Sequence, residues 1–211
     1  MLKKERAIKA VQGLEKLYPD AICSLEYSDA FQLLIATRLS AQCTDKRVNM
    51  VTPDLFKEFP TAEKMAEAKL SRVEELIKTC GLYKTKAKDL IGIAKSLMKN
   101  YGGIVPDTIE ELTTLPGVGR KTANLVVGDI YKKPAVVTDT HFIRICNRLG
   151  LVNSTNPLIV EREMRKILPD DKSNDFCHRT VLFGRDICTA RKAYCEKCPL
   201  AEICPKRLKK K

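Results

Sequence analysis

The sequence predicts an all-α protein. Apolar residues recur every three or four positions along most of its 211 residues, which is the spacing of one face of a helix. Residues that commonly start helices (Thr, Asp, Asn) or end them (Gly, Pro) separate these segments. The one strand-like run, from Pro134 to Thr138, is too short and unpartnered to indicate a sheet.

The first half of the chain contains five predicted helices. They are a helix over 4–18 with Ile8, Val11, Leu14, Leu17 and Tyr18 on one face, a buried central helix from Ser28, a helix capped by Thr44, a short helix opened by a capping box of Ser71 and Glu74, and a long amphipathic helix over 86–100. The central helix is apolar on nearly all sides between Phe31 and Ala36, as expected of a buried helix.

The second half of the chain continues the helical pattern. Asp107 and Glu110 form a predicted capping box that opens a helix, a hairpin and a second helix over 108–131. Later helices begin at Asp139, at Asn156-Pro157 and near Ser173, and the last of them runs to Ile187. The basic tail, 206–211, is expected to be a solvated end.

The composition is strongly basic. The chain has 38 Lys and Arg against 26 Asp and Glu, a formal net charge of +12, which favours nucleic acid as a partner first and an anionic membrane surface second. No apolar run is long enough for a membrane-spanning helix, and the N-terminus leads into a mixed helix instead of an apolar signal core. We therefore expect an intracellular, cytoplasmic protein, associated with the nucleoid if the source is prokaryotic.

The segment from Leu115 to Ala123 is the strongest functional motif. Gly117 and Gly119 flank one apolar residue after Leu115-Pro116, so the backbone can turn tightly and expose its N–H groups to an anion. Lys121 then lies just inside the next helix, at the positive end of the helix dipole, where a cation is disfavoured. Partial burial there would favour the neutral amine, which is the nucleophilic form. The alternative is that this is a solvated helix start.

Four cysteines near the C-terminus have the spacing C-x6-C-x2-C-x5-C, at Cys188, Cys195, Cys198 and Cys204. Four thiolates so close together indicate either a four-iron cluster or one tetrahedral zinc ion, or a loop without a metal. Zinc ribbons usually pair two C-x2-C knuckles and this loop has one, so the spacing favours iron and sulfur. The loop also presents Arg191 and Lys192, which are either phosphate contacts or simply exposed charges. The other five cysteines are expected to be buried.

Three ordered motifs carry a resemblance to a known family. Leu115 to Ala123, Val137 to His141 and the four-cysteine ending resemble the endonuclease III family, of the helix-hairpin-helix DNA glycosylase superfamily, and the likeness extends to 39–42 and 81–84. The resemblance implies two domains. One is a six-helix barrel domain over 21–132 that includes the helix-hairpin-helix, and the other, 1–20 plus 133–211, carries a [4Fe-4S] cluster held by the four cysteines.

The same resemblance implies a role for individual residues. Lys121 matches the lysine that attacks C1′ of the damaged nucleotide, and Asp139 matches the carboxylate that assists it. Gly117, Val118 and Gly119 match the hairpin that holds a DNA phosphate, often through a monovalent cation. Gln42 and Leu82 match positions that enter the duplex where a base has been flipped out. On local grounds alone, Asp139 is a natural N-cap, Gln42 and Leu82 are helix-end or core residues, and His141 is a structural histidine.

The resemblance predicts a bifunctional DNA glycosylase and abasic-site lyase of base excision repair. It would act as a monomer, remove oxidised pyrimidines from duplex DNA and cut 3′ to the abasic site by β-elimination through a lysine Schiff base. Adenine and mismatch glycosylases of the superfamily typically lack the lysine found here at Lys121. A non-catalytic DNA-binding module would need neither this lysine nor Asp139. Arg38 and Cys43 depart from the family's pattern.

Overall fold

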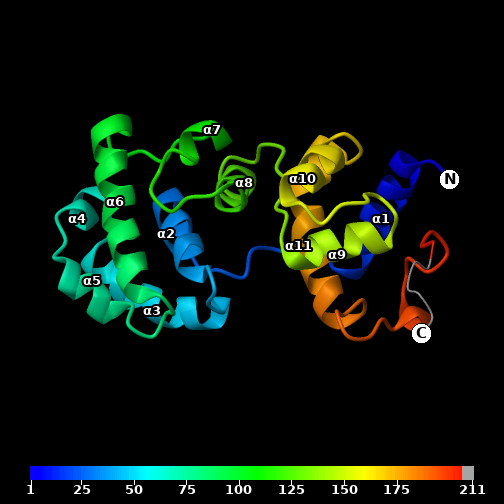
Figure 1. Ribbon diagram of the computed structural model, residues 1–211, viewed down its shortest axis with the longest axis horizontal. Helices are drawn as coiled ribbons and strands as arrows, with labels where there is room; N and C mark the ends of the chain where they lie inside the picture. Colours follow the sequence, from blue (N-terminus) through cyan, green and yellow to red (C-terminus); the bar gives the residue numbers. More distant parts are fainter. Residues whose placement is uncertain (206–211) are drawn as a thin grey trace. The chain divides into compact units, whose positions relative to one another are not determined.

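The computed structural model describes residues 1–205, and the basic tail 206–211 lies outside them. The described chain is almost entirely helical, as predicted, with no strand beyond an isolated bridge between Cys188 and Ala193 (Figure 1). In order, the elements are α1 (Lys3–Leu17), α2 (Ala30–Ser40), α3 (Asp45–Glu58), α4 (Ala62–Ala66), α5 (Leu70–Leu76), α6 (Tyr83–Tyr101), α7 (Ile109–Leu112), α8 (Arg120–Asp129), α9 (Thr140–Arg148), α10 (Pro157–Arg165), the short 3-10 turn η1 (Asp170–Lys172), α11 (Ser173–Asp186) and the 3-10 turn η2 (Cys195–Lys197). Among the described helices, none is long and apolar enough to cross a lipid bilayer.

The chain divides into two compact units. The central unit is the continuous segment Cys23–Tyr131, and the terminal unit combines Met1–Ile22 with the chain from Lys132 onward. Each unit has its own buried apolar residues, so each can be understood from its own packing.

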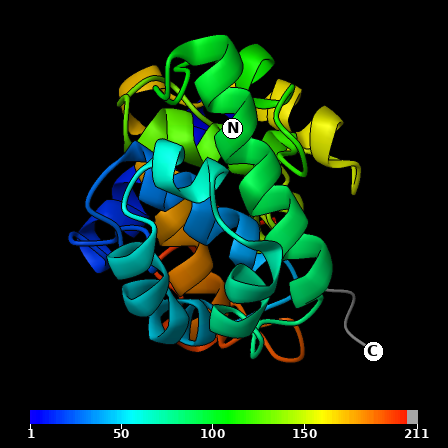
Figure 2. The same ribbon diagram turned by 90° about the vertical axis from the view of Figure 1, so that its left-hand side faces the viewer.

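The central unit is built around α2. This helix is buried along almost its whole length, as predicted, and packs against α3, α6 and α8. The long helix α6 also packs against the short helices α4 and α5, and Figure 2 shows these three elements together. Thr44 caps α3 as predicted, because its side chain accepts a hydrogen bond from the N–H of Arg47 at 3.3 Å.

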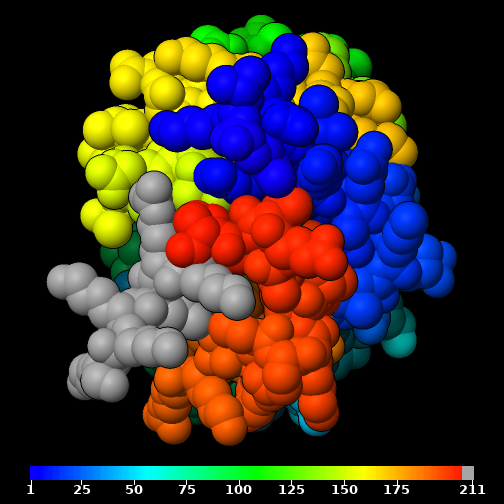
Figure 3. Space-filling view, turned by 90° about the vertical axis from the view of Figure 1, so that its right-hand side faces the viewer, coloured from blue at the N-terminus to red at the C-terminus, as the bar shows by residue number. Residues whose placement is uncertain are grey.

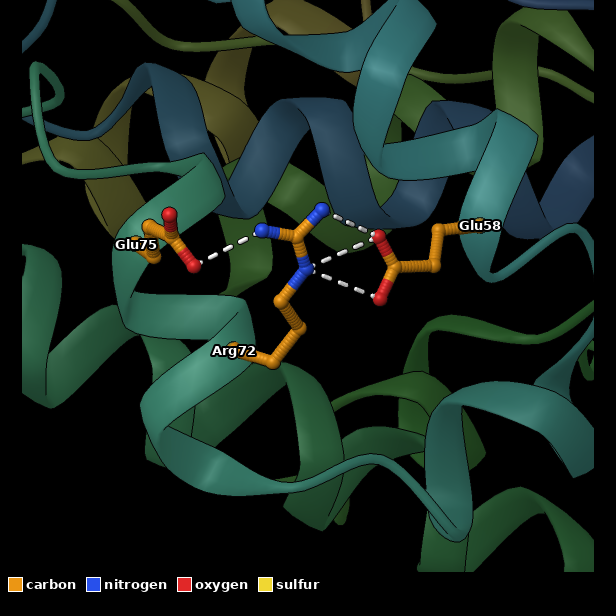
Figure 4. Close-up of polar contacts among 3 residues, drawn as sticks. All are labelled: Glu58, Arg72 and Glu75. Carbon is orange, nitrogen blue, oxygen red and sulfur yellow. Dashed lines mark hydrogen bonds and ion pairs between the residues drawn. The ribbon is translucent and has the colours of Figure 1, made fainter.

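Both capping boxes predicted for this unit are wrong, because the N-cap residue lies two residues earlier in one helix and one residue later in the other. The first helix of the pair, α5, begins at Leu70, so Ser71 lies inside it and caps nothing. Its first turn is held instead by Arg72, whose guanidinium bridges Glu58 at 2.8 Å and Glu75 at 2.7 Å (Figure 4). These charged contacts and the burial of Val73 outweigh the weak cap of a serine.

Before α7, the cap is Thr108 and not Asp107. The Thr108 hydroxyl oxygen accepts from the N–H of Glu111 at 3.3 Å and donates its own hydrogen to the Glu111 carboxylate at 2.6 Å. A Thr and Glu pair therefore caps this helix one residue later than predicted. The long helix α6 begins three residues earlier than predicted, because the Leu82 carbonyl already accepts from the N–H of Lys86 at 3.0 Å.

The terminal unit packs α11 against α1 and α9. Its core includes an edge-to-face contact between Phe142 and Phe176, with ring centroids 6.0 Å apart. The buried face of α1 differs from the predicted one: Ala7, Ala10, Val11 and Leu14 are buried, whereas Ile8 and Leu17 are exposed. Gly13 of this helix lies against the cysteine loop, residues 188–204, because a Cβ there would be 2.6 Å from Leu200. Figure 3 shows this C-terminal segment beside α1.

The strand-like run before α9 is extended coil, as expected of an unpartnered segment. Its N–H groups bond to side chains of α11, at 3.2 Å from Ala135 to the Ser173 hydroxyl and 3.2 Å from Val137 to the Cys177 sulfur. These contacts replace the ladder that a neighbouring strand would supply, and they fix the chain that leads into Asp139.

Candidate functional site

The hairpin between α7 and α8 has the geometry that its two glycines predict. Gly117 has a φ of +68°, in the left-handed region, and Gly119 is the N-cap residue of α8 without a capping side chain. Between them Val118 is buried and its N–H donates to the Leu115 carbonyl at 3.1 Å. The valine therefore anchors the turn in the core, while both glycines present bare backbone at the surface.

A partly buried ion pair packs against the hairpin at Gly117. A Cβ on Gly117 would lie 2.5 Å from Arg38 Nε and 2.8 Å from Asp89 Oδ2, so only glycine fits at this position. Arg38 of α2 and Asp89 of α6 are joined at 2.9 Å, from Nε to Oδ2, with side chains that are only 14% and 20% exposed. The arginine that interrupts the apolar run of α2 is thus a support of the hairpin. Sequence reasoning missed this pair, and its only signal was a lone charge on a buried helix.

Lys121 is the second residue of α8, and its side chain is exposed. The sequence left open whether this side chain is partially buried, and the structure places it at the surface. The first turn of α8 contains no acidic residue, and the amides of a first helical turn have no acceptor within their own helix. The hairpin and this helix start therefore present backbone N–H groups of the kind that bind anions, with an exposed amine beside them.

Gln42 and Leu82 occupy two loops of the central unit in the same strained conformation. Their φ angles are +54° and +58°, in the left-handed region that residues with a side chain seldom adopt. Both are exposed, Leu82 by 61%, so neither is a core residue. A Cβ on Gly81 would lie 3.5 Å from the Gln42 carbonyl oxygen, so the loops are neighbours. Exposed residues in strained conformations are typical of functional positions.

Asp139 is the N-cap residue of α9, in the terminal unit. Its carboxylate accepts a hydrogen bond from the N–H of Phe142 at 2.7 Å, and the side chain is half-buried. The N-cap interpretation made from local sequence is therefore correct. It is compatible with a catalytic role, because a capping carboxylate is held rigidly beside the positive end of a helix.

His141 is a structural residue of the same unit. Arg144 donates to its Nδ1 at 3.2 Å and to the Gly184 carbonyl at 2.9 Å, and a Cβ on Gly184 would lie 2.8 Å from both side chains. Burial lowers the pKa of His141, Arg144 and Arg185 lower it further, and Asp139 opposes them. A histidine in this setting favours its neutral form.

The four C-terminal cysteines line one cavity between α9, α11 and the cysteine loop. The apolar part of the wall comes from Ile145, Leu149, Phe183 and Ile187, among others. Burial raises the pKa of Cys198, and the other three cysteines raise it further, so all four thiols share one electrostatic environment. Within residues 1–205, no group of three or more His, Cys, Asp or Glu is arranged to hold a single metal ion.

Arg148 ties α9 to the cysteine loop and was not found by sequence reasoning. Its guanidinium donates to the Cys188 sulfur at 3.2 Å, to the Thr189 carbonyl at 2.7 Å and to the Ala190 carbonyl at 3.3 Å. Arg191 and Lys192 follow in the loop and are exposed, with the Lys192 ammonium 4.8 Å from the centre of the Tyr194 ring. The loop is therefore held from inside while its cations face solvent.

Comparison with known proteins gives the family. Residues 35–170 match the family model HhH-GPD, described as "HhH-GPD superfamily base excision DNA repair protein". Endonuclease III of Synechocystis sp. is 46% identical over 204 residues, which is 96% of this chain and 93% of the relative. The chain belongs to the endonuclease III family.

Solved structures agree with this membership in the endonuclease III family. A trapped endonuclease III–DNA covalent intermediate, an estranged-adenine complex, has a TM-score of 0.90 and 40% identity to this chain, covering 98% of it and 97% of that chain. A thermostable thymine-DNA glycosylase has a TM-score of 0.86 and 25% identity, covering 96% of each chain. The helix-hairpin-helix predicted over 108–131 therefore lies within a fold that this chain shares with endonuclease III over nearly its whole length.

Proposed function

We propose that this chain is a bifunctional DNA glycosylase and abasic-site lyase of base excision repair that removes oxidised pyrimidines from duplex DNA. The observation that carries the proposal is the hairpin, which combines exposed glycine backbone with an accessible amine at Lys121. In this proposal the central unit serves as the six-helix barrel domain expected over 21–132, and the terminal unit as the cluster domain.

DNA binding would begin at the hairpin. The backbone of Gly117 to Gly119 would hold one phosphate, through a monovalent cation when DNA is bound, because free amides and a helix start attract anions. The net charge of +12 adds a sequence-independent attraction to the duplex. Gln42 and Leu82 would enter the duplex where the damaged base leaves the stack, and their exposure and proximity support this role.

Lys121 would carry out the covalent step. Its neutral Nζ attacks C1′ of the damaged nucleotide, the bond from C1′ to the base breaks, and the base departs with the bonding electrons and a proton. Loss of the sugar-ring oxygen from C1′ leaves a Schiff base, and β-elimination then breaks the strand on the 3′ side. Exposure of Lys121 gives the substrate access to the amine.

Asp139 would act on the same reaction as an ionised carboxylate. Such a group accepts a proton from the Lys121 ammonium before the attack and stabilises positive charge on the sugar as the base leaves. Its N-cap hydrogen bond at 2.7 Å fixes the direction of the carboxylate.

The cysteine residues fit a [4Fe-4S] cluster better than zinc. Zinc ribbons usually pair two C-x2-C knuckles, and this loop has one. The four thiols line one cavity. Cys188, Cys195, Cys198 and Cys204 would hold the cluster, whose contribution is to fold the loop that presents Arg191 and Lys192 to a phosphate.

A strand-cleavage assay tests the proposal. One duplex carries a single thymine glycol, a second carries an abasic site, and both are incubated with wild type and Lys121→Ala. We expect wild type to cut both and Lys121→Ala to cut neither while still binding. Lys99→Ala, which removes an exposed lysine from the last turn of α6, is the matched control and should retain cleavage. Binding without cleavage by wild type would instead support a non-catalytic phosphate clamp.

A further inference from the structure

Two cysteines lie in the neighbouring loops that carry Gln42 and Leu82. Cys43 follows Gln42 directly, and its N–H donates to the Ser40 carbonyl at the end of α2, at 3.0 Å. Cys80 precedes Leu82 by two residues, and its N–H donates to the Ile77 carbonyl after α5, at 2.8 Å. Each cysteine is therefore fixed by a tight turn at the end of a helix. The 3.5 Å approach of a Gly81 Cβ to the Gln42 carbonyl places the two backbones side by side.

The two thiols interact but differ in access. Cys80 is fully buried, and burial followed by the neighbouring Cys43 raises the pKa of its thiol to about 11. Cys43 is half-buried, so a small molecule can reach it from solvent. An accessible thiol in a loop beside that of a buried one suits thiol–disulfide exchange, because the first can react with a small disulfide from solvent and the second can resolve the intermediate.

A buried cation accompanies this thiol pair. Lys86 is fully buried, and its Nζ donates to the Leu39 carbonyl near the end of α2 at 2.8 Å. Burial lowers the pKa of Lys86, while Cys43 and Cys80 act in the opposite direction. The C-terminal ends of α2 and α5 disfavour negative charge here. At Cys80 the charge of Lys86 acts against this effect, because it lowers the pKa of that thiol.

We propose that Cys43 and Cys80 form a reversible disulfide that joins the two loops carrying Gln42 and Leu82. The oxidant is a low-molecular-weight disulfide. The Cys43 thiolate attacks one of its sulfurs, forms a mixed disulfide and releases one small thiolate. The Cys80 thiolate then attacks Sγ of Cys43, which forms the protein disulfide and releases the second small thiolate. The two cysteine protons end on the two released thiols, so two cysteines are oxidised and one small disulfide is reduced.

Peptide mapping of the whole protein tests the bond without DNA. The protein is treated with oxidised glutathione, the remaining thiols are blocked, and it is digested with trypsin. We expect peptides 39–46 and 79–84 to be recovered as one cross-linked species that is lost after reduction. The species should be absent from Cys43→Ser and from Cys80→Ala, and present in Cys23→Ser, which changes another half-buried cysteine of the same unit.

Two results would overturn the proposed bond. One is an end point at which Cys43 carries glutathione and Cys80 stays reduced, which would mean that the sulfurs cannot meet. The other is a cross-link from either cysteine to a different partner. Both outcomes are read in the wild-type protein, so they do not depend on whether the Cys80→Ala variant folds.

The consequence for DNA binding rests on the proposed function of Gln42 and Leu82. A disulfide draws the two sulfurs to bonding distance, which alters the spacing of these residues. We expect roughly tenfold weaker binding of an abasic duplex after oxidation, about 1.4 kcal/mol, and full recovery on reduction. Cys43→Ser should be insensitive to the oxidant. Unchanged affinity of the cross-linked protein would overturn this consequence. The reduced protein tests the repair function separately, so the two failures can be told apart.

Discussion

Substitution of Gly117 by alanine tests the packing that supports the hairpin. An alanine at a φ of +68° costs about 1–2 kcal/mol, of which about 0.4–1 kcal/mol is offset by a less flexible unfolded chain. In addition, the new Cβ lies 2.5 Å from Arg38 Nε and 2.8 Å from Asp89 Oδ2, so the ion pair must move. Hydrogen bonds between charged groups contribute about 1.5–3 kcal/mol. We expect Gly117→Ala to lower the free energy of unfolding by about 3 kcal/mol.

Gly102→Ala is the matched control for this prediction. Gly102 has a φ of +58°, but a Cβ there would meet nothing within 4 Å, so only the backbone term applies. Thermal unfolding should give a decrease in Tm of about 6–12 °C for Gly117→Ala and about 1–4 °C for Gly102→Ala, at roughly 2–4 °C per kcal/mol for a chain of this size. The reasoning is refuted if both variants lose the same stability. Arg38→Ala removes the atom that a Cβ on residue 117 would contact. The double variant Arg38→Ala/Gly117→Ala should therefore lose less stability than the sum of the losses in the two single variants.

Three further predictions concern the terminal unit. Asp139→Asn should keep the cap and change the free energy of unfolding by less than about 0.5 kcal/mol, because Asn caps as well as Asp. It should nevertheless slow base removal by about a hundredfold or more. Full activity of this variant in single-turnover assays would contradict the prediction. Arg148→Met should lose iron and its absorbance at ~400 nm on mild heating, since the hydrogen-bond donors to Cys188 and Thr189 are gone. A variant that retains as much iron as wild type would contradict this. Because the pKa of His141 is lowered in the folded state, the unfolded state binds more protons below about pH 6.5. Stability to urea should therefore fall as the pH decreases through that value. The fall should be smaller in His141→Asn. Equal pH dependence in both proteins would exclude His141 as the cause.

The elements of the fold were largely predictable because their signals are local. A helix face, a Thr, Asp or Asn cap and a terminating glycine act within one or two turns, which is why α2, α3, α9 and α10 begin close to where the sequence predicts. The errors also have local causes. Ser71 and Asp107 were displaced as caps by Arg72 with its ion pairs and by the neighbouring Thr108, and a capping preference of about 1 kcal/mol is too small to resist such competitors.

Residues that act through distant partners were not predictable. Arg38 and Asp89 are 51 positions apart, and Arg148 reaches a sulfur 40 positions away, so no window of sequence contains both members of either pair. Likewise the exposure of Lys121 depends on what packs around α8, whereas its position at the start of that helix follows from Gly119 alone. Motif spacing selects the candidate site residues, and tertiary packing decides how each is presented.

Borohydride trapping on abasic DNA tests the central claim most directly. Reduction of a Schiff base converts it to a stable amine, so a lysine that attacks C1′ becomes covalently attached to the DNA. We predict that wild type forms one trapped adduct, that peptide mapping places it on Lys121, and that Lys121→Gln forms none while Lys99→Ala forms as much as wild type. An undiminished adduct in Lys121→Gln, or no adduct with wild type, would contradict the assignment of Lys121 as the nucleophile.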